Sequence, residues 1–81
     1  MDFYLEEKIM PTIDMKATGL NIKKNIDKKG MKVKDIATVL GFSSAYPVYK
    51  WVNGQNMPNI DNLVALAAML DTTIDNLLVV N

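Results

Sequence analysis

The chain has 81 residues, of which 49% are hydrophobic, and it contains no cysteine and no histidine. A chain of this length forms one domain with a modest core. The missing residue types remove thiolate chemistry, the commonest general base and the commonest metal ligand. No apolar run is long enough to span a membrane, and no signal-peptide pattern opens the chain, so we expect a soluble cytoplasmic protein.

The net charge is zero, but the charges are unevenly distributed. Residues 17–54 hold seven lysines and two acids, whereas residues 1–16 hold four acids and two lysines, and residues 55–81 hold three acids and no base. A basic segment between acidic ends indicates an anionic partner. A solvated lysine-rich face explains the pattern equally well, so both interpretations stay open.

Residues 1–13 show no helical period and are interpreted as an N-terminal arm, in which Phe3, Leu5 and Ile9 could form a short strand. The remaining residues, 14–81, form the predicted domain.

A first helix can be capped by Asp14 or Thr18, carries Ile22 and Ile26 on one face, and ends at Gly30. Leu20 lies near that face in the sequence.

The second helix has the clearest pattern. Its apolar residues follow the spacing i, i+3, i+4, i+7, with a glycine directly after the last of them: Val33, Ile36, Ala37, Leu40 and Gly41.

A third helix is predicted over residues 44–53, with Ser44 as its N-cap and an inward face made by Val48, Trp51 and Val52. Trp51 falls in this inward register, so we interpret it as a core residue.

Two further helices close the domain. The fourth starts at Asn59 or Asp61, and its buried stripe comprises Leu63, Leu66, Ala67 and Leu70, with Ile60 and Val64 beside it. The fifth is capped by Thr72 or Thr73 and bears Ile74, Leu77 and Leu78.

Five short helices with short connectors predict an all-α, compact bundle. Within it, residues 33–52 have the layout of a helix-turn-helix unit, whose second helix projects from the surface and fits the major groove of DNA.

At many of these positions the sequence resembles the lambda-repressor-like (Cro/cI, XRE-type) helix-turn-helix domain. The resemblance covers roughly residues 14–79. It rests on Gly19, Gly30-Met31, Asp35-Ile36-Ala37, Leu40-Gly41-Phe42-Ser43, Val48-Tyr49-Lys50-Trp51, Gly54, Pro58, Leu63, Leu66-Ala67, Leu70 and Leu77-Leu78. It implies five helices, with the third as the recognition helix.

The sequence departs from this family at several points. Ile26 and Val52 stand where members often carry a buried arginine–glutamate pair, so hydrophobic packing replaces an ion pair there. The turn after Gly41 is one residue longer than in the shortest members. Pro47 sits early in the third helix, and the residue before a proline is biased away from α geometry, so the leading end of that helix can be irregular.

The resemblance and the outward register together predict a set of DNA-binding residues. The set comprises Lys32, Lys34, Ser44, Ala45, Tyr46, Tyr49, Lys50, Gln55 and Asn56. Because the chain has no arginine, the commonest guanine-reading side chain is missing, and base contacts fall to lysine, tyrosine, serine and alanine.

Each of these residues has a structural alternative. Ser44 can be a helix cap, and the lysines can serve solubility. Tyr46 and Tyr49 can contact DNA, or they can pack against another helix or a dimer partner. DNA contact is favoured for Tyr46, and the alternatives for Tyr49 are equally balanced.

We therefore predict a sequence-specific regulator of transcription that binds double-stranded DNA, acts as a homodimer through Leu78, Val79, Val80 and the arm, and uses no cofactor or small-molecule substrate. An enzyme is rejected because no catalytic constellation is present. The alternative is a protein-interaction module, antitoxin-like or an adaptor, that keeps the fold without binding DNA. Zero net charge, the absence of arginine and Pro47 favour this alternative.

Overall fold

The computed structural model describes residues 10–81. Five helices form this part of the chain: α2 (Met15–Lys28), α3 (Val33–Val39), α4 (Tyr46–Val52), α5 (Ile60–Met69) and α6 (Ile74–Leu77). The predicted all-α fold with five helices is thus confirmed. The suggested strand at Phe3, Leu5 and Ile9 lies outside the described residues.

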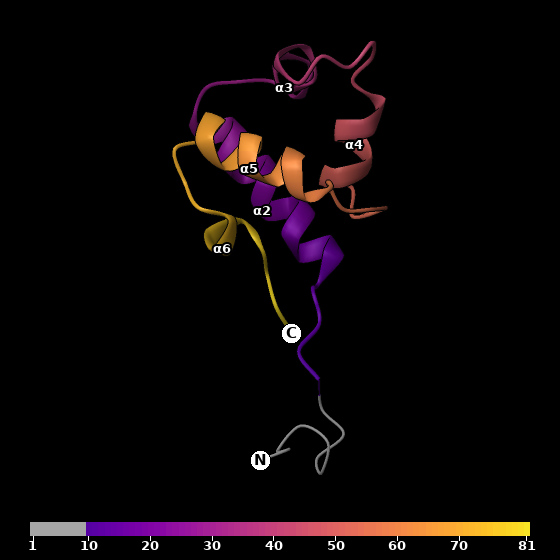
Figure 1. Cartoon of the computed structure of the whole chain (residues 1–81), viewed down its shortest axis with the longest axis vertical. Helices are drawn as coiled ribbons and strands as arrows, with labels where there is room; N and C mark the ends of the chain where they lie inside the picture. Colours follow the sequence, from indigo (N-terminus) through magenta and orange to yellow (C-terminus); the bar gives the residue numbers. More distant parts are fainter. Residues whose placement is uncertain (1–9) are drawn as a thin grey trace.

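The long helix α2 runs through the middle of the molecule (Figure 1). It packs against α4 and α6, while α3 packs against α4, and α5 against α6. As a result, α3 and α4 occupy one end of the molecule, and residues 10–14 and the C-terminus lie at the opposite end (Figure 1).

Side-chain caps start three of the helices as the sequence predicted. Asp14 Oδ1 accepts from the Ala17 amide at 2.9 Å, Asn59 Oδ1 caps α5, and Thr73 Oγ1 caps α6. Each oxygen satisfies an amide that has no partner within the helix.

Thr18, the other predicted cap of the first helix, has a different role. It is fully buried, and its Oγ1 accepts from the Val79 amide at 2.9 Å, which fastens the C-terminal segment to α2. The same segment continues into an antiparallel bridge between Ile13 and Val80. The two ends of the described chain are therefore tied together.

The core is formed by the predicted inward faces. Completely buried side chains come from every helix: Ile22, Ile26, Ile36, Val48, Leu66 and Leu77. Ile26 and Val52 both belong to this core, so hydrophobic side chains do occupy these two positions. Leu20, Ile60 and Val64, which the sequence placed beside the buried faces, are more than half exposed.

The predicted N-cap of the third helix, Ser44, is wrong by one residue. The helix begins at Tyr46, with Ala45 at the cap position, and ends at Val52 rather than residue 53. Ser44 Oγ accepts from the Tyr46 amide at 3.3 Å but lies ahead of the cap. Pro47, which has no amide hydrogen, falls in the first turn, where a helix needs no donor.

Gly19 sets the distance between α2 and α4. A Cβ at this position would lie 2.7 Å from the Val52 carbonyl oxygen and would also overlap the Trp51 carbonyl oxygen. Because backbone atoms cannot move aside as a flexible side chain does, only glycine allows the C-terminal end of α4 to approach α2 so closely. This contact fixes the orientation of α4.

Candidate nucleic-acid interface

The turn between α3 and α4 is held by the core beneath it. Gly41 has φ +81°, a conformation that glycine adopts without strain, and the Phe42 amide then donates to the Ala37 carbonyl oxygen at 3.0 Å. The Phe42 ring meets the Trp51 ring edge to face, with 5.7 Å between centroids. The predicted helix-turn-helix unit is therefore present, with Trp51 in the core.

The outer face of α4 carries the predicted tyrosines and lysine. Tyr46 is 65% exposed and Tyr49 is 50% exposed. Lys50 is half-buried, and its ammonium lies 5.2 Å from the centroid of the Tyr46 ring, one helical turn earlier. Ala45 is half-buried at the leading end of the helix. Among residues 10–81, no neighbouring helix buries either tyrosine.

Lys32 and Lys34 are exposed at the beginning of α3. The Lys32 amide donates to Asp35 Oδ2 at 2.8 Å, so this amide is already paired within the chain. The ammonium groups, rather than the amide of Lys32, are thus the groups available to an anion at this position.

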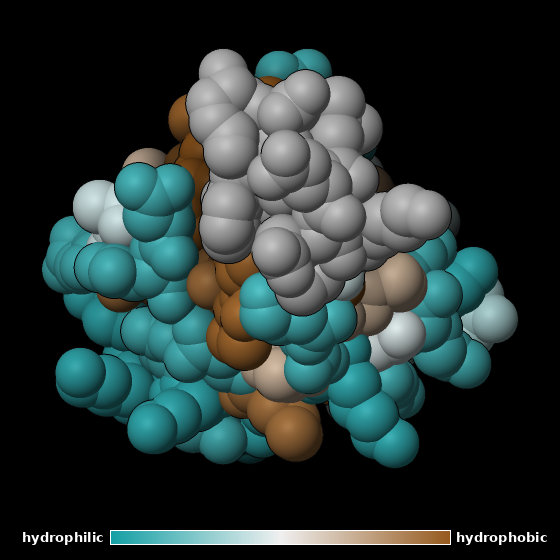
Figure 2. Space-filling view, turned by 90° about the horizontal axis from the view of Figure 1, so that it is seen from below, coloured by the Kyte–Doolittle hydropathy of each residue, from teal (hydrophilic) through white to brown (hydrophobic). Residues whose placement is uncertain are grey.

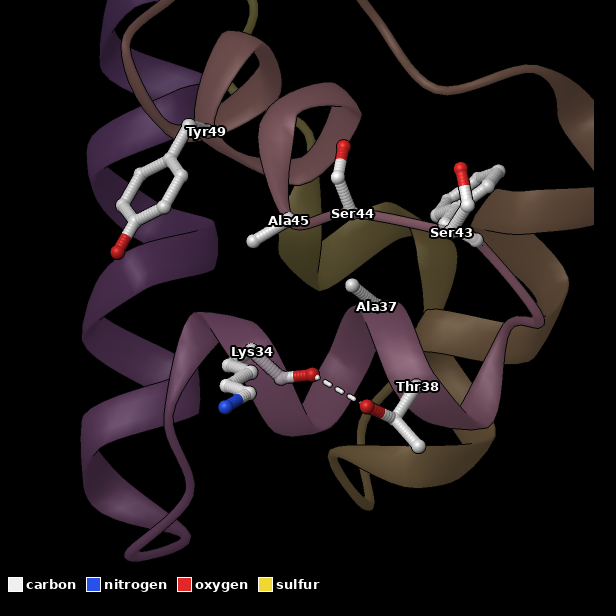
Figure 3. Close-up of a pocket in the computed structure, with 8 residues that line it drawn as sticks. Lys34, Ala37, Thr38, Ser43, Ser44, Ala45 and Tyr49 are labelled. Atoms are coloured by element: carbon white, nitrogen blue, oxygen red, sulfur yellow. Dashed lines mark hydrogen bonds between the residues drawn. The ribbon is translucent and has the colours of Figure 1, made fainter.

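A hollow of about 270 Å³ lies between α3 and α4. Figure 3 shows the methyl groups of Ala37 and Ala45 facing this space, with Tyr49 on the same side as Lys34. The Thr38 hydroxyl donates to the Lys34 carbonyl oxygen at 3.0 Å (Figure 3). Four predicted site residues, Lys34, Ser44, Ala45 and Tyr49, therefore line one surface.

The predicted set lacks four residues that line the same hollow: Ala37, which the sequence assigns to the buried face of α3, and Thr38, Phe42 and Ser43. For Thr38 a signal was present, because it lies four residues after Lys34 and therefore on the same face of the helix. Ser43 and Phe42 lie in the turn, where no periodic pattern predicts the direction of a side chain.

Gln55 and Asn56 come just after the turn that follows α4, and both are exposed. Their amides donate to the Lys50 carbonyl oxygen at 2.9 and 3.4 Å, which closes the C-terminal end of the helix. Both residues thus lie at the opposite end of α4 from Ser44.

The charges of this surface are mostly positive: Asp35 is the one acidic residue of α3, and α4 has none. No acidic residue occurs between Asp35 and Asp61 in the sequence. Within residues 10–81 the ion pairs join Lys23 to Asp27 and Lys29 to Asp71, both on other parts of the molecule. Lys32, Lys34 and Lys50 form no ion pair with any described residue, so their charges are available to a polyanion.

No helix between residues 10 and 81 has the length and apolar character needed to cross a membrane. No group of three or more acidic side chains within the same residues is arranged to hold a metal ion.

Comparisons with known proteins agree with this geometry. Residues 22–77 match the HTH_3 helix-turn-helix family model. The fold resembles the crystal structure of the restriction-modification controller protein C.AhdI from Aeromonas hydrophila, with a TM-score of 0.70 and 22% identity over 95% of this chain and 99% of that one. No match was found among curated proteins. Because the family model spans most of the chain, the protein belongs to the HTH_3 family of lambda-repressor-like helix-turn-helix DNA-binding domains.

Proposed function

We propose that the protein is a sequence-specific regulator of transcription that binds double-stranded DNA and inserts α4 into the major groove. The observation that carries this proposal is the surface of α3 and α4, which holds two exposed tyrosines and three lysines that form no ion pair with any described residue. The only carboxylate on these two helices is that of Asp35, which caps the start of α3. A surface of this kind offers cations to phosphates and aromatic groups to bases.

Each element of the surface has a distinct role in the proposed complex. Lys32 and Lys34 contact backbone phosphates from the start of α3, and Gln55 and Asn56 do so from the far end of α4. Tyr46, Lys50, Ala45 and Ser44 face the bases or the adjoining backbone at the leading end of α4. Tyr49 lies beside the hollow next to Lys34, where its hydroxyl can reach a phosphate.

A selection of bound duplexes from a random pool at low salt tests the proposal. The wild-type protein is expected to enrich a defined sequence motif. The Tyr46→Ala/Lys50→Ala protein is expected to enrich a less sharply defined motif. Lys32→Ala/Lys34→Ala is expected to weaken binding to all duplexes alike and to reduce the slope of log affinity against log salt by about 2, since each lost phosphate contact removes about 0.9.

The matched control is Lys24→Ala/Lys28→Ala, which removes the same charge from exposed positions on α2. It is expected to change the salt slope far less, because both lysines lie on α2, outside the α3–α4 surface. If no duplex is enriched and no binding depends on salt, the DNA-binding proposal is wrong. The protein-interaction module is then the better description, and the search turns to protein partners.

We also propose that two copies act together on half-sites one helical turn apart, as domains of this type generally do. At the end of the molecule opposite α3 and α4, Met10 is 60% exposed and Val80 is 54% exposed. Hydrophobic residues are visible on this end in Figure 2. Light scattering at high protein concentration is expected to give the mass of a dimer, and Val80→Asp is expected to shift it toward the monomer. A monomer mass for the wild type would contradict the proposed pairing.

A further inference from the structure

We infer that Lys50 reads a guanine in the DNA site and that Tyr46 is the positioning residue that holds the Lys50 ammonium at the leading end of α4. This inference rests on the proposed function, because it specifies which base the helix recognises and how. It starts from the pair that these two side chains form on the outer face of α4.

The geometry of the Tyr46–Lys50 pair determines where the positive charge of Lys50 lies. Lys50 comes four residues after Tyr46, so both side chains lie on the same face of the helix. The ammonium lies 5.2 Å from the centroid of the Tyr46 ring, within the range of a cation–π interaction. Lys50 belongs to the C-terminal part of α4, but its side chain thus places the charge near the N-terminal end of the helix. In the proposed complex, that end of α4 enters the groove first.

Nothing else described in the structure competes for this ammonium. Lys50 makes no ion pair with residues 10–81, in contrast to Lys23 and Lys29. It is half-buried, whereas Tyr46 is 65% exposed, so the ring and the lysine stem cover each other while the pair stays open to solvent. A ring occupies one side of the ammonium and leaves N–H donors free on the other.

The chemistry of the ammonium selects the base. Lysine offers three donors and no acceptor. In the major groove guanine alone presents two neighbouring acceptors, N7 and O6; adenine places a donor beside N7, cytosine presents a donor, and thymine presents the single acceptor O4. An ammonium fixed in one place therefore favours guanine. Since the chain has no arginine and α4 carries no other lysine, this contact is the one cationic base contact that α4 can make.

The experiment uses the full chain and the duplex enriched by the pool selection. Each G·C pair of the motif is replaced in turn by A·T, and each guanine by 7-deazaguanine, which lacks the N7 acceptor. For the wild type, one position in each half-site is expected to show about a tenfold preference for guanine. Lys50→Ala is expected to abolish the preference at that position alone.

Two variants of Tyr46 isolate the role of the ring. Tyr46→Phe and Tyr46→Leu both lose the hydroxyl, but only Tyr46→Phe keeps the aromatic face. Tyr46→Phe is expected to keep the guanine preference, and Tyr46→Leu to reduce it about two- to fivefold at the same position. The ratio of affinities for guanine and adenine duplexes is the readout, because a general loss of folded protein lowers both affinities and leaves their ratio unchanged.

Different failures point to different errors. If Lys50→Ala weakens binding to every duplex alike and lowers the salt slope, Lys50 contacts a phosphate, and the inference is overturned while the proposed function stands. If Tyr46→Leu and Tyr46→Phe keep the same preference, Tyr46 does not position Lys50. A wild type that binds no duplex overturns the proposed function and this inference with it.

Discussion

The two faces of α4 differ in almost every respect, although the helix has only seven residues. Its inner face is buried, with Val48 completely inaccessible and Trp51 only 5% exposed. Its outer face leaves Tyr46 and Tyr49 at least half exposed. Two large aromatic residues separated by a single position, Tyr49 and Trp51, therefore experience opposite environments.

This difference separates stability from recognition. Seven residues are too few for a helix to be stable alone, so α4 exists because its inner face is packed against the rest of the domain. The outer face contributes little to that packing, so substitutions there are expected to leave the protein folded. A residue of α4 is thus expected to affect either folding or DNA binding, according to the face on which it lies.

The largest expected effect comes from removing the inner aromatic residue. Trp51→Ala leaves a cavity beside Phe42 and is expected to lower the free energy of unfolding by about 3–5 kcal/mol, a large share of the stability of a small domain. Urea unfolding followed by circular dichroism measures this loss.

Tyr49→Ala is the matched control, since it removes an aromatic side chain from the same helix on the other face. It is expected to change the free energy of unfolding by less than about 0.5 kcal/mol, while it weakens the proposed DNA binding. Equal losses of stability in the two variants would contradict the division of α4 into two faces.

A smaller effect is expected from Gly19→Ala, which changes the contact between α2 and the C-terminal end of α4. In an exposed helix this change would stabilise by up to about 1 kcal/mol. Here the added Cβ would meet backbone atoms of Val52 at 2.7 and 2.9 Å. The clash is expected to outweigh the gain in helix propensity and to lower the free energy of unfolding by about 1–3 kcal/mol.

Thermal unfolding checks this expectation, with Leu20→Ala as the control at a neighbouring position that is 65% exposed. The control is expected to shift the midpoint little. A Gly19→Ala protein as stable as the wild type would mean that α2 and α4 can separate without cost, and the orientation of α4 would then not depend on Gly19.

The smallest expected effect lies far from α4, at the surface pair of Lys29 and Asp71, whose atoms Nζ and Oδ2 are 2.7 Å apart. A hydrogen bond from Lys29 and its positive charge lower the pKa of Asp71 below the ordinary value of 3.8. The pair therefore stabilises the fold above that value, and its contribution is lost as the pH falls through the lowered pKa.

Asp71→Asn removes the charge while keeping a side chain that tolerates the positive φ of 53° at this position. The difference in thermal midpoint between wild type and variant is expected to be small at neutral pH and to shrink below about pH 4. High salt is expected to reduce it as well. A difference that persists at low pH would show that the carboxylate charge is not its cause.

The sequence predicted the inner side of the molecule better than its outer side. The periodic spacing of Val33, Ile36 and Ala37 marks a buried face, and the structure confirms it. The same spacing cannot place the start of α4, because Ser44, Ala45 and Tyr46 are all compatible with a turn or a helix. Leu20 and Ile60 are hydrophobic and lie beside the buried faces in the sequence, but in the structure they are 65% and 70% exposed.

For the candidate site, the sequence identified residue types that suit DNA, and the structure decided which of them lie together. Lys34 and Tyr49 are 15 positions apart, yet they line one hollow because the turn after Gly41 brings α4 back across α3. The pairing of Tyr46 with Lys50 required knowing that both lie in one helix and which way the lysine bends.

By itself, then, the sequence determined the five helices, the caps of α2, α5 and α6, and the inward faces, because these depend on local propensities and on spacing along the chain. Tertiary structure alone decided the role of Thr18 at the C-terminal segment, the close approach at Gly19 and the gathering of α3 and α4 side chains on one surface. Each of these depends on contacts between residues distant in sequence, whose geometry follows from how the whole core packs and not from any local pattern.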